Sequence, residues 1–397
     1  MSATFTLQEY ADEVIDLGPE DAHWLVDQTQ GKFVIRRTLD GDRVIVNPQQ
    51  FVGVMTLPSG IRLTIAPKVP APNLFVMLAT AFRLPSPFRQ SAASFATLDQ
   101  ILEFLVDEFV RLVEDRVSAG LHRSYVEREE NLTAVRGRIP IAEDMRRNLI
   151  ERHHVFCRFT EFSWDIPENQ IIRQVAHQLA NWVTDPKRRL RLWQIDHLLV
   201  EVTPTAMPAH AIDRFVYTRQ NDDYEPIHHL CRLFLEGSSV SEHAGNTPFN
   251  TFLLDMNRLF ESFVTQVLHD RAPAGLRLED QHTTTLDRDG YLAIRPDLLV
   301  SRNLGPVLVA DCKYKRLDHE PFRHHDVYQV LAYCTAFGID HGMLIYPRSE
   351  RSVSGDLSIR NRGTVIRQIG LDLAGTPNDL QVACDELAAH VYRWAVA

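Results

Sequence analysis

The sequence predicts a mixed fold of the α+β class, built from two regions. Short β-branched runs between turn residues predict a small antiparallel β unit over residues 30–70. Apolar residues at helical spacing predict helices over 168–236. The C-terminal part follows an α-β-β-β-α-β order, which is typical of a sheet covered by helices. Because 397 residues exceed one ordinary core, we expect an N-terminal region, 1–245, and a second domain, 246–397, joined near the Ser/Gly-rich stretch 236–248.

The N-terminal elements follow from turn residues and apolar spacing. Turns at Asp40-Gly41-Asp42 and Pro58-Ser59-Gly60 separate β-branched runs that are typical of strands. These strands are expected at 32–37, 43–46, 50–57 and 61–69. Apolar residues then recur every three or four positions, which indicates helices with one buried face. The helices are expected at 73–83, 97–118, 168–183, 186–199 and 223–236.

Residues 122–164 have a different pattern and predict a projecting, partly extended element. The polar run RSYVEREENLTAVRGRIP and the alternating run VFCRFTEFSW flank MRRNLIERHH, which is rich in Arg and His. Arg136 and Arg138 lie on either side of Gly137, and glycine permits a tight turn. The two arginines are therefore expected near a turn of this element.

The C-terminal elements alternate in type. A helix is expected at 249–270, where apolar residues form one stripe. Three strands follow, at 276–285, 291–300 and 306–315, separated by Gly-containing turns. A helix at 323–337, a short buried strand at 341–347 and a terminal helix at 377–394 complete the order.

Composition excludes several classes of protein. The net charge of −10 argues against unaided DNA binding, because proteins that grip DNA alone are usually basic. A nucleic-acid role would need local basic patches or a partner. The five cysteines form no Cys-x-x-Cys pair, which argues against a disulfide framework or a structural zinc site. No apolar run reaches membrane-spanning length and no signal-peptide pattern precedes the fold, so we expect a cytoplasmic protein without a membrane partner.

The strongest chemical signal lies on two neighbouring strands of the C-terminal region. Asp311 and Lys313 are two residues apart, so on a strand they point to the same face. Asp297 lies in the middle of the preceding predicted strand, next to Pro296, and proline interrupts strand ladders. Across a hairpin the two aspartates can meet, and close carboxylates repel unless a cation joins them. Mg²⁺ prefers such oxygen ligands, and Lys313 would then lie beside an attacking water and a phosphate.

These residues also have a structural explanation. An Asp-x-Lys triplet is a weak signal by itself, since Asp185-Pro186-Lys187 is a second example that we interpret as the turn before a helix. A strand that ends in charges often simply reaches solvent.

Other catalytic motifs are absent from the sequence. Gly31-Lys32 is not preceded by the glycine of a phosphate-binding loop, and the histidines of 319–324 have the wrong spacing for a zinc site. The chain is therefore expected to bind no nucleotide itself.

Pro296-Asp297 and Asp311-Cys312-Lys313 together resemble the PD-(D/E)xK nuclease motif, whose αβββαβ core matches the predicted order. The resemblance implies a Mg²⁺ ion, which Mn²⁺ is expected to replace. It further implies that Asp297, Asp311 and the backbone carbonyl of Cys312 hold this ion, and that Lys313 acts on the reacting groups.

The same resemblance implies three further site residues. In the superfamily a Glu on the first helix often joins the metal site, so the resemblance implies that Glu261 is a further ligand of the ion. A branch of the superfamily similar to the RecB-type nucleases adds Gln-xxx-Tyr on the next helix, here Gln329 and Tyr333. Each has an ordinary alternative: a solvated helix edge for Glu261, the core for Tyr333 and the helix surface for Gln329.

Over most of its length the chain resembles the McrC family, the nuclease subunit of McrBC-type restriction systems. The resemblance rests on the nuclease motif and on five segments in order: FVGVMTLPSGIRLTIAPKV, GLHRSYVEREENLTAVRGRI, CRFTEFSWDIPENQIIR, YTRQNDDYEP and MNRLFESFV. It implies a prokaryotic, Mg²⁺-dependent endonuclease that cuts double-stranded DNA modified at cytosine. It also implies a partner, an AAA+ GTPase of the McrB type that forms a hexameric ring, whose GTP hydrolysis this subunit stimulates.

The resemblance leads to a hypothesis about the projecting element. We expect residues 122–164, with Arg136 and Arg138, to enter the pore of the partner ring. Two other functions stay open: a non-catalytic scaffold or activator of the GTPase, and a free-standing repair nuclease of the RecB type. The intact motif argues against the first, and the large N-terminal region and negative net charge argue against the second.

Overall fold

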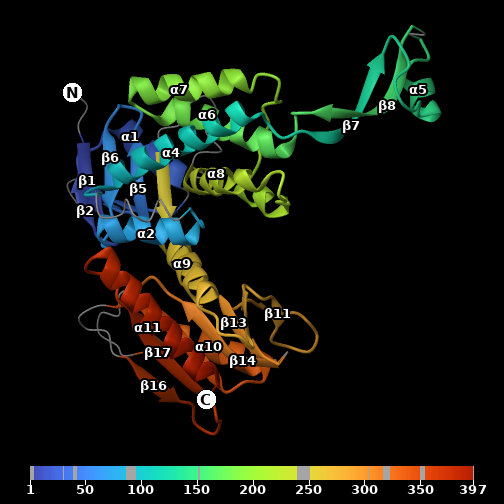
Figure 1. The fold of residues 1–397 in the computed structure, drawn as a ribbon. Coiled ribbons are helices and arrows are strands. Elements are labelled where there is room, and N and C mark those ends of the chain that lie inside the picture. The colour runs from blue at the N-terminus through green and yellow to red at the C-terminus, as the bar shows by residue number, and fades with distance from the viewer. Residues whose placement is uncertain are drawn as a thin grey trace. The chain divides into compact units, whose positions relative to one another are not determined.

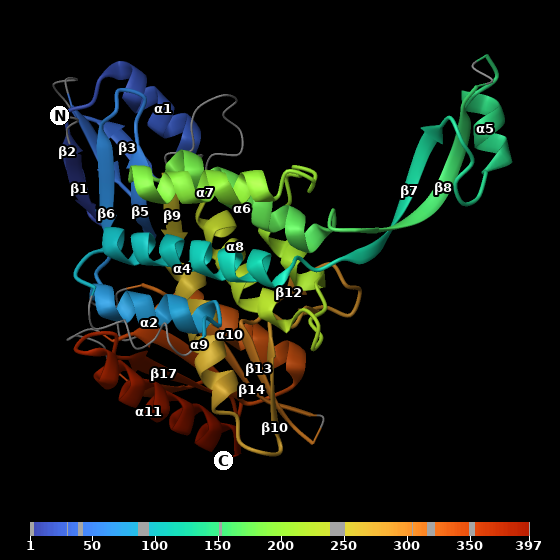
Figure 2. The same ribbon diagram turned by 45° about the horizontal axis from the view of Figure 1, so that its top comes forward.

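The computed structural model describes residues 4–29, 31–38, 43–85, 95–150, 153–238, 251–303, 305–315, 322–348 and 354–396. They form two compact units, drawn in Figures 1 and 2, one of residues 4–102 with 251–396 and one of residues 103–238. The first unit thus combines N-terminal and C-terminal residues, and the units do not follow the boundary predicted at 245. Residues 239–248 of the predicted linker, the turn at 40–42 and residues 319–321 of the histidine stretch 319–324 lie outside the described residues.

The N-terminal part of the first unit contains a four-stranded sheet in the order β1-β6-β5-β9. Its strands are β1 (Thr4–Gln8), β6 (Arg62–Ala66), β5 (Phe51–Thr56) and β9 (Thr251–Asp255). β1 runs parallel to β6, and β5 runs antiparallel to both β6 and β9. A three-stranded sheet of β2 (Glu13–Ile15), β4 (Val44–Asn47) and β3 (Val34–Arg37) and the helix α1 (Pro19–Thr29) pack on the same core. Sequence patterns did not predict β1, β2 or α1.

The prediction of a helix at 249–270 was wrong for its first residues. Residues 251–255 form β9, which pairs with β5 from Phe51 opposite Asp255 to Met55 opposite Thr251. Gly53 permits this close pairing, because a Cβ atom there would lie 2.0 Å from the carbonyl oxygen of Phe252. The helix α9 (Met256–Asp270) starts one residue later, where the Asp255 side chain accepts hydrogen bonds from the first free N–H groups.

The second unit contains helices and one long hairpin. The helix α4 (Leu98–Ala119) enters it, and α6 (Pro167–Trp182), α7 (Pro186–Leu198) and α8 (Glu225–Ser238) follow. All four lie within two residues of their predicted bounds. Asp185 caps α7 by accepting from the N–H of Arg188 at 2.8 Å, so the second Asp-x-Lys triplet is a helix start, as predicted.

The hairpin occupies the region predicted as a projecting element. β7 (Ser124–Leu132) and β8 (Val155–Ser163) pair antiparallel along their full length, and α5 (Ile141–Arg147) lies between them in sequence. Both views show the hairpin extending away from α6, α7 and α8 of the same unit (Figures 1 and 2). At its base, Asp165 accepts hydrogen bonds from Arg128, Gln170 and both the N–H and hydroxyl of Thr203. These bonds outweigh burial and lower the pKa of Asp165.

The C-terminal part of the first unit is a six-stranded mixed sheet in the order β10-β13-β14-β15-β17-β16. Its strands are β10 (Leu276–Asp280), β13 (Leu298–Arg302), β14 (Gly305–Cys312), β15 (His341–Pro347), β17 (Val365–Leu371) and β16 (Gly355–Ser358). With α9 and α10 (His324–Phe337), the predicted αβββαβ order is confirmed. β16 and β17 were not predicted. The predicted strand 291–300 is in fact broken, because β12 (Ala293–Ile294) pairs with β11 (Thr284–Thr285) in a separate small sheet.

The helices cover this sheet and position its side chains. Side chains of alternating residues of β13, β14 and β15 share a buried cluster with α10; they include Leu299, Val309, Leu344 and Tyr346. The helix α11 (Pro377–Val396) contacts β14 and β17, and it also contacts α2 (Ala71–Ala81) of the N-terminal part. Within the described residues, no helix combines the length and the apolar character needed to span a bilayer.

Candidate active site

Asp297 and Asp311 lie at neighbouring strand ends. The register of β13 and β14 pairs Leu298 with Ala310, so the next position along places Asp297 opposite Asp311. Asp297 was predicted in the middle of a strand but lies immediately before β13, because Pro296 interrupts the chain there. Asp311 has the same strand parity as Val309, which places its side chain on the face covered by α10.

The Asp297 carboxylate is bound to the end of the adjacent strand. Its Oδ2 accepts a hydrogen bond of 2.7 Å from the N–H of Cys312. Burial, followed by the charges of Asp311 and Glu261, raises the pKa of Asp297 to about 8, although Cys312 and Lys313 oppose the rise. The fully ionised site would therefore hold more negative charge than Lys313 compensates.

Asp311 and Lys313 form an ion pair. Nζ of Lys313 lies 2.5 Å from Oδ2 of Asp311, whose side chain is 1% exposed. Burial raises the pKa of Asp311 even though Lys313 opposes the shift. Burial also acts to lower the pKa of Lys313, but Asp311 outweighs it and the pKa is raised, so the lysine stays charged. Its backbone N–H donates to the carbonyl of Ile345 on β15 at 2.9 Å.

Gln329 and Tyr333 join the site through the segment before Asp297. Nε2 of Gln329 donates to the hydroxyl of Tyr333 at 2.8 Å, and that hydroxyl donates to the carbonyl of Arg295 at 3.3 Å. Tyr333 is buried, as its structural alternative predicted, but its hydroxyl also anchors the irregular backbone beside Asp297. Burial and the charge of Asp311 raise the pKa of Tyr333 to about 12, which keeps the hydroxyl protonated and able to donate.

Glu261 belongs to the same electrostatic cluster and is linked to it by Gln281. Oε1 of Glu261 accepts a hydrogen bond of 2.7 Å from Nε2 of Gln281, and the N–H of Gln281 donates to the carbonyl of Asp297 at 3.0 Å. The side-chain oxygen of Gln281 accepts from Arg295. Sequence reasoning missed Gln281, which follows β10 with a left-handed φ of 49° that no local pattern signals.

A second missed residue is Asp326, at the start of α10. Its side chain is 1% exposed and accepts a hydrogen bond of 2.9 Å from the hydroxyl of Tyr346. Nζ of Lys315 lies 3.6 Å from the other carboxylate oxygen. The two lysines after β14 therefore have different partners, Asp311 for Lys313 and Asp326 for Lys315. The only sequence feature that could have indicated the pair of Lys315 and Asp326 is the acidic residue in the first turn of the predicted helix.

The two aspartates fit a divalent cation with a partly hydrated shell. Among the described residues, no group of three or more His, Cys, Asp or Glu side chains could hold a metal ion. However, Mg²⁺ is commonly held by one or two carboxylates and keeps several waters. The N–H and C=O of one strand residue point to the same side, so the Cys312 carbonyl faces the Asp297 side as its N–H does. Two aspartates and one carbonyl are therefore the groups that could hold such an ion.

Arg136 and Arg138 lie on the hairpin of the second unit and not with the carboxylates. The guanidinium carbon of Arg136 lies 4.0 Å from the ring centre of Phe159, and Nη2 lies 3.1 Å from Oε1 of Glu161. The backbone N–H of Arg138 donates to the carbonyl of Arg158, and the N–H of Arg158 donates to the carbonyl of Arg138. Gly137 between them has φ of 68°, and a Cβ atom there would lie 2.5 Å from the Arg158 carbonyl oxygen. The turn therefore requires glycine.

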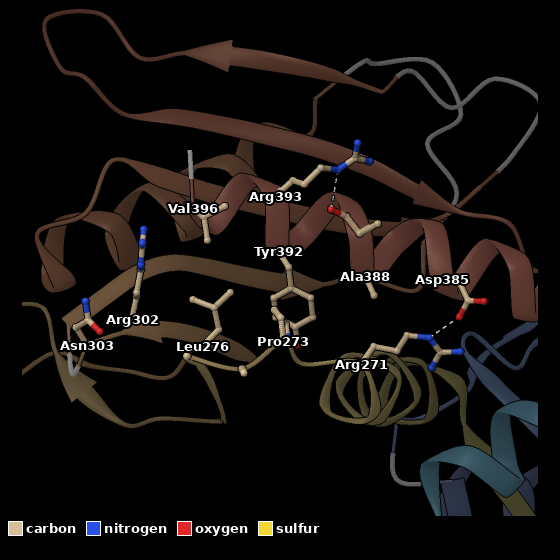
Figure 3. A pocket seen from close by; sticks show the side chains of 13 residues that line it. Arg271, Pro273, Leu276, Arg302, Asn303, Asp385, Ala388, Tyr392, Arg393 and Val396 are labelled. Atoms are coloured by element: carbon tan, nitrogen blue, oxygen red, sulfur yellow. Dashed lines mark hydrogen bonds and ion pairs between the residues drawn. The ribbon is translucent and has the colours of Figure 1, made fainter.

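A cavity of about 790 Å³ lies elsewhere in the first unit, between α11 and the far end of the hairpin β13–β14 (Figure 3). Tyr392 and Val396 of α11 face Leu276 and Pro273 across it, and Arg271 points to Asp385, which it contacts at 2.6 Å. None of the predicted catalytic residues lines this cavity.

Comparisons with known proteins give a family model and similar solved structures. A family model described as the McrBC 5-methylcytosine restriction system component matches residues 46–347. A chain from the refined half-complex of a tetradecameric assembly of Thermococcus gammatolerans McrB AAA+ hexamers with bound McrC is similar in fold, with a TM-score of 0.56 and 16% identity over 97% of this chain and 100% of that one. A chain of the Thermococcus gammatolerans McrBC complex matches with a TM-score of 0.42 and 20% identity over 68% and 88%. No curated protein matches the sequence.

Proposed function

The chain belongs to the McrBC family of 5-methylcytosine restriction system components, and from this premise we propose that it is the McrC-type endonuclease subunit, which cuts DNA with Mg²⁺. The observation that carries the proposal is the geometry around Cys312. Its N–H donates to Asp297, and its neighbours, the buried Asp311 and the half-buried Lys313, form an ion pair at the same strand end. Two carboxylates and one lysine in this arrangement suit phosphodiester hydrolysis.

The residues of the chain have separate roles in this proposal. Asp297, Asp311 and the Cys312 carbonyl would hold Mg²⁺, which supplies Lewis-acid activation of the phosphate and of a water when bound. The Lys313 ammonium carries three donors, of which one meets Asp311. The others can orient the attacking water and stabilise negative charge that develops on the phosphate. Gln329 and Tyr333 hold the backbone before Asp297 and so keep the two carboxylates opposed.

Glu261 is proposed as an outer member of the site. Its charge raises the pKa of Asp297, and Gln281 links its carboxylate to the backbone of Asp297. It would act on a water of the hydrated ion, because Mg²⁺ gives up its waters reluctantly.

The proposed partner is an AAA+ GTPase of the McrB type that forms a hexameric ring. In support, the chain similar in fold comes from an assembly of McrB AAA+ hexamers with bound McrC. The substrate proposed is double-stranded DNA modified at cytosine, with the modification read by the partner, since this chain carries a net charge of −10. The hairpin β7–β8 with Arg136 and Arg138 is the element proposed to enter the ring and stimulate GTP hydrolysis.

The proposal is tested by reconstitution. The purified chain is mixed with a McrB-type protein from the same genome, GTP, Mg²⁺ and a plasmid methylated at cytosine, and each component is omitted in turn. Linear products that require all five components are expected, with Mn²⁺ able to replace Mg²⁺. Cleavage without the partner would instead favour the free-standing repair nuclease. Stimulated GTP hydrolysis without cleavage would favour the non-catalytic activator.

A further inference from the structure

Tyr314, the residue after the catalytic lysine, is bound by side chains on the opposite face of the sheet from Lys313. Tyr314 has the opposite strand parity to Lys313, and it is 5% exposed. Its ring centre lies 5.8 Å from that of Phe260 on α9. Its hydroxyl donates a hydrogen bond of 2.9 Å to Oε1 of Glu9, and its backbone carbonyl accepts one of 3.0 Å from the hydroxyl of Tyr10. Two consecutive residues more than 300 positions away thus bind both ends of Tyr314.

Glu9 and Tyr10 are themselves fixed by the N-terminal sheet. The N–H of Glu9 donates to the carbonyl of Ala66, the last residue of β6, and the N–H of Tyr10 donates to the carbonyl of Gln49. Oε1 of Glu9 also accepts a hydrogen bond of 2.6 Å from the N–H of Lys68. Glu9 is fully buried, which raises its pKa. The buried carboxyl of Glu9 and the hydroxyl of Tyr10 therefore join the N-terminal strands to the segment that follows β14.

The backbone of Tyr10 has an uncommon conformation that makes this junction possible. On an extended strand, consecutive side chains point to opposite faces, so Glu9 and Tyr10 could not both reach Tyr314. Tyr10 leaves the strand direction with φ of 56°, in the left-handed region that bulky residues rarely adopt. Such conformations occur where the surroundings hold them and where a site depends on them.

We propose that Tyr10 and Glu9 are positioning residues for Lys313, so that the N-terminal sheet forms part of the support of the nuclease site. They hold the backbone of Tyr314, and Lys313 is the residue before it. The inference rests on the proposed nuclease function. It goes beyond that function by assigning a role in cleavage to residues that contact neither the two aspartates nor the lysine side chain.

The test is the substitution Tyr10→Phe, which removes one hydroxyl and keeps the ring. The matched control is Tyr392→Phe, because Tyr392 also lies in the first unit and its hydroxyl also donates to a backbone carbonyl, that of Leu268, at 2.6 Å. Glu9→Gln keeps an acceptor for both of its donors, whereas Glu9→Ala removes it. Each variant is assayed as the full chain with its GTPase partner.

Two readouts are combined. Tyr10→Phe and Glu9→Ala should lower kcat for cleavage about fivefold at an unchanged KM for DNA, while Tyr392→Phe and Glu9→Gln should stay near wild type. In the chain without metal, Tyr10→Phe should raise the hydrogen-exchange rate of the Lys313 amide, which bonds to Ile345. The exchange measurement works even if the wild type does not cut, so failure of the proposed function and failure of this inference are distinguishable. An unchanged exchange rate, or an unchanged kcat in an active protein, would overturn the inference.

Discussion

The backbone N–H of Cys312 donates a hydrogen bond of 2.7 Å to Oδ2 of Asp297. This bond joins the carboxylate before β13 to the end of β14, where Asp311 and Lys313 lie on either side of Cys312. It stabilises the charged form of Asp297 only in part, because burial and Asp311 still raise the pKa of Asp297 to about 8. The fold thus holds two repelling carboxylates together, and a divalent cation is the compensation their chemistry favours.

Asp297→Asn should stabilise the protein in the absence of metal and remove its response to Mg²⁺. Asparagine keeps an acceptor for the Cys312 N–H and cannot ionise. It therefore avoids the penalty that a carboxyl with a raised pKa carries above its unfolded pKa, and the free energy of unfolding at pH 7 should rise by about 1–2 kcal/mol. Thermal unfolding with and without Mg²⁺ measures both effects. Asp280→Asn, at the exposed end of β10, should respond to Mg²⁺ as wild type does. A wild-type response in Asp297→Asn would show that the ion binds elsewhere.

Tyr333→Phe should slow cleavage about fivefold without unfolding the protein. The substitution removes the hydroxyl that links Gln329 to the carbonyl of Arg295, and one such hydrogen bond contributes about 1 kcal/mol. Single-turnover cleavage rates measure the effect. Tyr328→Phe is the matched control, since Tyr328 lies on the same helix and is 67% exposed. Equal rates for the two variants would make Tyr333 an ordinary core residue.

Reversing the charges of Arg136 and Arg138 should abolish stimulation of the partner's GTP hydrolysis. Both residues are exposed on the hairpin, so their replacement by Glu should leave the melting temperature within a few degrees of wild type. GTP turnover by the McrB-type protein is measured with increasing amounts of each variant. Arg37→Glu, on an exposed position of β3, is the control. Full stimulation by the double variant would exclude these arginines from the contact with the ring.

The stability of the second unit should fall as pH falls below about 6.5. His228 is fully buried between Tyr217 and the carbonyl of Glu168, and burial lowers its pKa to about 4. Because the unfolded chain binds the proton more tightly, stability is unchanged above the unfolded pKa and is lost between pH 6.5 and 4, by at most about 3 kcal/mol.

This pH dependence is measured by urea unfolding, followed by the tryptophans of the second unit. His228→Gln should flatten the dependence between pH 6.5 and 4, whereas replacement of the exposed His197 by Gln should not. An equally steep loss of stability in His228→Gln would assign the effect to other groups.

The central residues of the site could be predicted because they follow strand parity. Asp311 and Lys313 share a face whatever the surroundings, and Asp297 is opposite them once the hairpin register is known. The partners of the second lysine could not be predicted in this way. Lys315 lies near Asp326 only because α10 packs across the sheet. The spacing of residues along the sequence does not predict how one element packs on another.

The N-terminal contribution was missed for a related reason. β1 pairs in parallel with β6, from Thr4 opposite Arg62 to Gln8 opposite Ala66. Strands so far apart in sequence are not joined by a tight turn, so turn residues cannot predict their pairing. β9 was not predicted because its apolar residues continue the helical stripe of α9, so this segment fits both the helical and the strand periodicity. Tertiary pairing with β5 decides between the two.

The most direct test of the nuclease assignment compares Lys313→Ala with wild type in the reconstituted system, scoring cleavage and GTP turnover together. Lys187→Ala, in the second Asp-x-Lys triplet, is the matched control because that triplet only starts a helix. Cleavage by Lys313→Ala should fall by about 10²–10³-fold while stimulated GTP hydrolysis stays at the wild-type rate. Equal cleavage by Lys313→Ala and wild type would contradict the assignment and leave the chain as an activator of its partner.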